Sequence, residues 1–112
     1  MSLTSTVMNN ARIVTVNVER IDAAMAIQFK EDMRAETETT PDRVILDLSA
    51  VTFVDSSGLG AIVAAMKQLG DHRRLDLAGL TPVVDKVFRL TRMDTVFKLF
   101  PSLEDALTTL DG

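Results

Sequence analysis

Residues 43–70 read RVILDLSAVTFVDSSGLGAIVAAMKQLG, and this stretch decides the fold because it changes from strand to helix in its middle. The β-branched and large apolar side chains of Val44, Ile45, Leu46 and Leu48 predict a buried strand. A second apolar patch (Val51, Phe53, Val54) is followed by the polar segment DSSG at 55–58. Beyond it, apolar residues recur at helical spacing along one face: Leu59, Ile62, Val63, Met66 and Leu69.

The segment 55–58 therefore lies where a strand turns into a helix. The first amide groups of a helix have no partners inside it, and an aspartate or serine just before the helix can accept their hydrogen bonds. The partial positive charge there also suits an anion such as a phosphate. Gly58 and Gly60 both fall in the first turn, where each costs up to about 1 kcal/mol relative to alanine. Their missing side chains indicate a close approach, either by a neighbouring strand or by a partner.

Length and composition restrict the class of protein. The 112 residues suit one domain spanning 1–112, and the net charge of −4 argues against a nucleic-acid partner, which would need a basic surface. The chain has no cysteine, no apolar run near the ~20 residues that span a bilayer, and no basic start followed by an apolar block. We therefore expect a cytoplasmic protein with no membrane insertion.

The residues before this stretch predict two strands and a helix. Residues 4–18 partly alternate between apolar and polar side chains on either side of Asn9-Asn10, a pair typical of turns. Asp22 is expected to cap a helix over residues 23–38. The face expected to pack inward carries Ala26, Phe29, Lys30 and Met33.

The residues after it predict a strand, a helix, a short strand and a final helix. The segment Gly70-Asp71-His72 signals the end of a helix, with His72 as a solvated loop residue. Residues 75–78 and 96–100 are the expected strands. Thr81 is expected to cap one helix, with Pro82 at its first position, and Ser102 to cap the other, with Asp105 at capping-box spacing. The expected buried faces are Val83, Val84, Val87, Phe88 and Leu90 in the first helix and Leu103, Ala106, Leu107 and Leu110 in the second.

The element order is therefore ββαβαβα(β)α, which places the chain in the α/β class. Strands that alternate with helices need crossover connections, so we expect a mixed, mostly parallel sheet of four to five strands with about four helices.

The sequence contains no recognisable catalytic constellation. Ser56 or Ser57 as a nucleophile would need a base, but GxSxG is absent and His72 is the only imidazole. The glycine-bearing loop lacks the lysine and spacing of a P-loop. Asp47 could cluster with Asp22 and Asp55, although the last two are better explained as caps. We expect no catalytic, cofactor or metal residues, and not an enzyme.

What remains is a pair of hydroxyls at the start of a helix. Ser56 and Ser57 are either capping groups or a phosphorylation site. A phosphate adds roughly −1.5 to −2 charges at neutral pH, which a helix N-terminus tolerates but which a partner surface facing the site, especially an acidic one, does not.

The stretch VILDLSAVTFVDSSGLGAIVAAMKQL closely resembles the central motif of STAS domains, and specifically of bacterial anti-sigma factor antagonists. The other expected elements fall in that family's order along nearly the whole chain. The resemblance implies that Ser56 is the phosphate acceptor and that Asp55 shapes the loop beside it. It implies that the helix that docks on a partner begins with Ser57, Gly58, Leu59 and Gly60.

The resemblance also places Asp22 near the acceptor, at the same end of the sheet. Here the chain departs from the family's G-x-L-D pattern, because it reads Glu19-Arg20-Ile21-Asp22, with glutamate in place of glycine. The backbone approach at Glu19 is therefore a point for the structure to test.

The mechanism implied by the resemblance is partner switching. The unphosphorylated protein binds an anti-sigma factor, itself a serine kinase with a Bergerat-type ATP site, and so frees a sigma factor or another regulator. Phosphorylation of Ser56 breaks that complex, and a metal-dependent serine phosphatase restores it. Two alternatives stay open: a STAS scaffold or small subunit of a signalling assembly or a lipid-transport ATPase, and a small nucleotide-binding protein.

Overall fold

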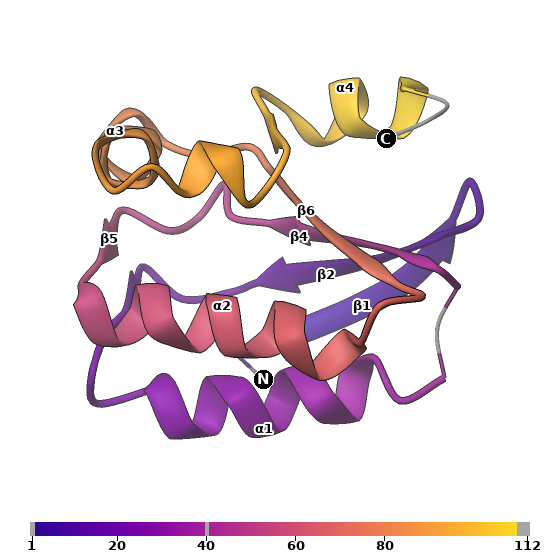
Figure 1. Cartoon of the computed structure of the whole chain (residues 1–112), viewed down its shortest axis with the longest axis horizontal. Coiled ribbons are helices and arrows are strands. Elements are labelled where there is room, and N and C mark those ends of the chain that lie inside the picture. The colour runs from indigo at the N-terminus through magenta and orange to yellow at the C-terminus, as the bar shows by residue number, and fades with distance from the viewer. Residues whose placement is uncertain (1, 40, 110–112) are drawn as a thin grey trace.

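The computed structural model describes residues 2–39 and 41–109, and it shows a sheet with helices on both sides (Figure 1). The strands are β1 (Leu3–Met8), β2 (Ala11–Val16), β3 (Arg20–Ile21), β4 (Arg43–Asp47), β5 (Phe53–Val54), β6 (Arg74–Ala78) and β7 (Leu99–Phe100). The helices are α1 (Ala26–Glu36), α2 (Ser56–Leu69), α3 (Pro82–Leu90) and α4 (Leu103–Thr108), with a 3-10 turn η1 (Met93–Thr95).

The main sheet is the mixed, mostly parallel sheet expected from the sequence. Its strand order is β1-β2-β4-β6-β7, and only the β1–β2 pair is antiparallel. Helices α1 and α2 lie side by side on one side of the sheet, and Val84 and Phe88 of α3 join the same core, while α4 packs on the opposite face (Figure 1). Alternate residues of β4 therefore face two different clusters: Val44 and Leu46 join the larger core, and Ile45 packs beneath α4.

The first hairpin turns at Asn9 and Asn10, as expected. Both residues adopt left-handed backbone conformations, with φ of 52° and 62°. Asparagine tolerates this region better than most residues, so a two-residue turn can join the strands.

A second, two-stranded parallel sheet was not expected. It pairs β3 with β5, placing Arg20 opposite Phe53 and Ile21 opposite Val54. Each strand has two residues, which is too short to give a periodic pattern in sequence. This small sheet joins the segment before α1 to the segment before α2.

The prediction for α1 was wrong at its start. The helix begins at Ala26 after Met25, and Asp22 does not cap it. The Asp22 carboxylate instead accepts from Arg20 at 3.3 Å, while three turn residues separate it from the helix. On the predicted inward face, Phe29 and Met33 are buried, whereas Lys30 is exposed.

The buried stripe of α2 is rotated from the expected one. It centres on Gly58, Ala61, Ile62, Ala65 and Leu69, while Leu59, Val63 and Met66 are half-buried. Helix α1 packs along α2, and the small residues of the buried stripe let neighbouring elements approach this helix closely.

Helix α3 departs from its prediction in two ways. Thr81 stands at the N-cap, but its hydroxyl donates to the Val51 carbonyl at 2.7 Å and does not cap the helix. Val84 and Phe88 are fully buried, whereas Val83 and Leu90 are 61% and 73% exposed. Residues seven apart share one helix face, and here that face is turned to solvent.

The final helix follows its predicted cap. Ser102 accepts from the Asp105 amide at 3.0 Å, and Ala106 is fully buried. Leu110, which we also placed on the buried face, lies outside the described residues.

Candidate functional site

Ser56 is the first residue of α2, directly after the strand β5 and the turn residue Asp55. Both Ser56 and Ser57 are exposed. Within residues 2–39 and 41–109, neither hydroxyl makes a hydrogen bond. The serines therefore present their hydroxyls to solvent and are not used to hold the local fold.

Asp55 performs the capping role that the sequence left open between aspartate and serine. Its Oδ1 accepts from the Gly58 amide at 2.8 Å, and its Oδ2 accepts from the Ala23 amide at 3.1 Å. The first bond caps α2, and the second ties α2 to the loop before α1. One carboxylate thus links the start of α2 to the loop before α1, which confirms the cap expected at Asp55.

The two glycines of the first turn have different surroundings. A Cβ on Gly58 would overlap the carbonyl oxygen of Ile21 and lie 2.7 Å from its carbonyl carbon. A Cβ on Gly60 would meet nothing within 4 Å. The neighbouring strand β3 therefore explains Gly58, whereas nothing inside the described chain requires glycine at position 60.

The segment around Glu19 pairs with residues 52–53 although it has glutamate where the family pattern has glycine. Its carbonyl oxygen accepts from the amides of Thr52 and Phe53 at 2.8 and 3.1 Å, and its side chain is exposed. Among the described residues, the non-glycine residues with positive φ are Asn9, Asn10 and Arg92, so Glu19 takes an ordinary backbone conformation. The departure from the family's glycine leaves the pairing of these segments intact.

The structure brings the predicted site residues to one end of the molecule. Asp22 lies one residue before Ala23, whose amide binds Asp55, and Ser56 follows Asp55. Asp47 does not share their contacts, because its carboxylate accepts from the Ser49 amide at 3.0 Å. The sequence did not identify the structural roles of Ile21, Ala23 and Phe53, since these depend on a pairing between distant segments.

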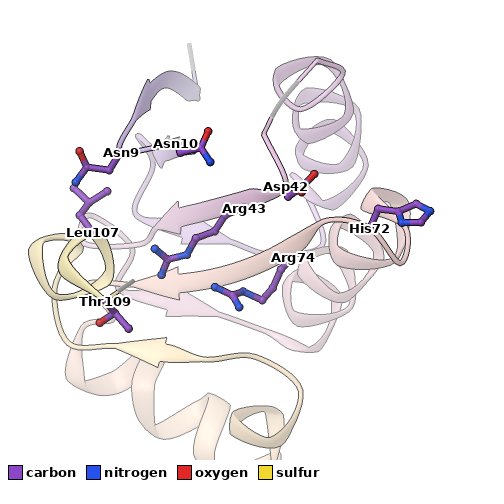
Figure 2. A pocket seen from close by; sticks show the side chains of 8 residues that line it. All are labelled: Asn9, Asn10, Asp42, Arg43, His72, Arg74, Leu107 and Thr109. Carbon is purple, nitrogen blue, oxygen red and sulfur yellow. The ribbon is translucent and has the colours of Figure 1, made fainter. Parts of the chain in front are cut away.

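A cavity of about 510 Å³ lies away from these residues (Figure 2). Arg43 and Arg74 project into it from the first residues of β4 and β6, while the exposed His72 points away. Both arginines bind the buried carboxylate of Asp76, at 2.8 and 3.1 Å. Among the described residues, the cavity is lined by Asn9, Asn10, Asp42, Arg43, His72, Arg74, Leu107 and Thr109, and none of these is a predicted site residue.

The described part of the chain contains no group of three or more histidine, cysteine, aspartate or glutamate side chains placed to hold a metal ion. None of its helices has both the length and the apolar character needed to cross a bilayer.

Comparison with known proteins gives the same fold. The STAS domain family matches residues 3–106. The chain is 29% identical over 112 residues to the anti-sigma-F factor antagonist RsfB of Mycobacterium tuberculosis, covering 99% of this chain and 92% of that protein. It superposes with a TM-score of 0.86 and 28% identity on an anti-sigma factor antagonist from Mycobacterium paratuberculosis, covering 98% and 93% of the two chains. A STAS domain protein from Planctomyces limnophilus shares the fold, with a TM-score of 0.87, 18% identity and 98% of each chain covered.

Proposed function

This chain belongs to the STAS domain family, and we propose that it is an anti-sigma factor antagonist that works by partner switching. In its unphosphorylated form it binds an anti-sigma factor that is also a serine kinase with a Bergerat-type ATP site. Binding releases a sigma factor or another regulator. Phosphorylation of Ser56 abolishes the binding, and a metal-dependent serine phosphatase reverses the modification.

The observation that carries this proposal is the exposed, unbonded hydroxyl of Ser56 beside a carboxylate that already caps the helix. A kinase can reach the hydroxyl without unfolding the site. Because Asp55 holds the backbone, adding a phosphate to Ser56 removes no hydrogen bond from the described structure. The modification therefore changes the surface and leaves the fold in place.

The electrostatics of the site favour a switch in binding. The phosphate adds roughly −1.5 to −2 charges at the N-terminus of α2, where the helix dipole is worth about 0.3–1 kcal/mol to a surface anion. Asp22 and Asp55 already make this end of the molecule acidic. A partner that fits the neutral serine would then face a concentrated negative charge.

The partner-binding surface in this proposal consists of Asp22 with the start of α2, from Ser57 to Gly60. Leu59 is half-buried, so it contributes mainly by packing the helix start against the core. The open space at Gly60 lets a partner's backbone approach α2 closely.

The protein acts in the cytoplasm as ligand and substrate, and it catalyses no reaction.

Intact-mass spectrometry tests the proposal. The protein is incubated with ATP and a candidate anti-sigma factor kinase, and the modified residue is mapped by fragmentation. One phosphate on Ser56, absent from the Ser56→Ala variant and retained by Ser57→Ala, is the expected result.

No phosphate from a kinase that is active on another substrate would contradict partner switching. It would favour a scaffold or transporter-subunit role. Titration with labelled ATP in the absence of kinase covers the remaining alternative, since saturable micromolar binding would indicate a nucleotide-binding protein.

A further inference from the structure

An exposed arginine stacks on a half-buried phenylalanine beside the proposed phosphorylation site. The guanidinium carbon of Arg20 lies 4.0 Å from the centre of the Phe53 ring. The Arg20 side chain is 60% exposed, and its Nε also donates to Asp22 at 3.3 Å. A cation is thus held on a ring at the surface and does not move freely in solvent.

The small β3–β5 sheet fixes this stack. Arg20 and Phe53 are opposite each other in the register, and their neighbours Ile21 and Val54 are buried in the core. Successive residues of a strand point to opposite faces, so burial of the second pair directs the first pair outward. The Glu19 carbonyl, which accepts from the Phe53 amide at 3.1 Å, holds the two strands at this level.

The stack is close to Ser56 along the chain. Phe53 and Ser56 are three residues apart, so their Cα atoms lie within roughly 11 Å of each other. At physiological ionic strength the screening length is about 8–10 Å, comparable with this upper bound, so a phosphate on Ser56 acts in attenuated form on a group bound at the stack. In the segments 19–22 and 53–56, Arg20 is basic, whereas Glu19, Asp22 and Asp55 are acidic.

We propose that Arg20, held over Phe53, is the anchor that binds an acidic side chain of the protein partner that docks at Ser56. This inference rests on the proposed function and adds the chemistry of the partner. A pre-oriented arginine loses little conformational freedom on binding, and arginines and aromatic residues dominate the energetics of protein interfaces. The partner's carboxylate takes the exposed edge of the guanidinium in place of solvent.

The anchor also supplies a reason for the switch. A phosphate on Ser56 repels a carboxylate bound at Arg20, with a strength that salt attenuates. Phosphorylation thereby weakens the same contact that Arg20 makes in the unphosphorylated complex.

Calorimetric titration of the unphosphorylated protein with the kinase that modifies Ser56, without ATP, tests the anchor. Arg20→Ala is expected to raise the Kd at least about tenfold, and Arg20→Lys to raise it less, because lysine keeps the charge but not the planar stack. Arg34→Ala, which removes another exposed arginine on α1, is the matched control and is expected to change the Kd less than about twofold. Unfolding midpoints of each variant show whether it remains folded.

The outcomes separate this inference from the proposed function. If the wild type binds and Arg20→Ala binds equally well, the anchor is overturned while partner switching stands. If folded wild type binds no kinase and receives no phosphate, both are overturned. The ionic contact is supported if high salt weakens wild-type binding and the difference in Kd between the wild type and Arg20→Ala becomes smaller.

Discussion

Replacing Gly58 with alanine is expected to destabilise the fold, although alanine is ordinarily the better helix residue. The added Cβ would overlap the Ile21 carbonyl oxygen and lie 2.7 Å from the carbonyl carbon. Both are backbone atoms of a residue that is fully buried. The same oxygen accepts from the Asp55 amide at 3.3 Å, so the strand cannot retreat without losing that bond.

Three contributions determine the expected change in the free energy of unfolding for Gly58→Ala. Alanine gains up to about 1 kcal/mol over glycine inside a helix. Overpacking against a fixed neighbour costs about 1–3 kcal/mol, and the upper end applies because the obstacle is backbone. Loss of the hydrogen bond costs about 1 kcal/mol. The net change is a loss of about 2–3 kcal/mol in the free energy of unfolding, or roughly 10 °C in Tm for a domain of this size.

Gly60→Ala is the matched control, because the same substitution two residues later meets open space. It is expected to raise the free energy of unfolding by up to about 1 kcal/mol. Urea unfolding followed by circular dichroism measures both variants against the wild type. Equal shifts for the two variants, or a stabilised Gly58→Ala, would refute the reasoning from the close approach of β3.

Three further substitutions test the site and the core. Ser56→Ala is expected to change the free energy of unfolding by less than about 0.5 kcal/mol, because the hydroxyl makes no hydrogen bond in the described structure. The same variant is expected to bind the kinase constitutively, whereas Ser56→Asp is expected to bind it more weakly. A Kd of Ser56→Asp equal to that of the wild type would mean that charge is not the signal. Asp55→Ala is expected to lower the free energy of unfolding, measured in urea, by about 1–3 kcal/mol, because two amides lose their acceptor. Asp55→Asn keeps one acceptor oxygen and is expected to lose less. Equal losses for the two variants would show that the double contact is unimportant. Asp76→Ala is expected to cost about 1.5–3 kcal/mol, since Arg43 and Arg74 lose hydrogen bonds to their shared buried carboxylate, and a loss under about 0.5 kcal/mol would contradict that role.

Local patterns in the sequence were sufficient for the order of the main-sheet strands and the helices, and for the turn at 55–58. The change from an apolar strand to helical spacing at 55–58 predicted the strand, turn and helix, and the sheet has the expected mixed, mostly parallel pairing. Asp55 as a cap followed from residue chemistry within three positions of the chain. These features depend on neighbours in sequence, and so sequence alone can specify them.

Features that depend on contacts between distant segments were decided only by the tertiary structure. Asp22 looked like a helix cap, but the helix begins later and Asp55, 32 residues away in sequence from Ala23, binds the amide in that loop. The exposure of Val83 and Leu90 depends on which face of α3 meets the core. The reason for Gly58, and the stack of Arg20 on Phe53, both arise because β3 pairs with β5, two strands too short to leave a periodic signal in the sequence.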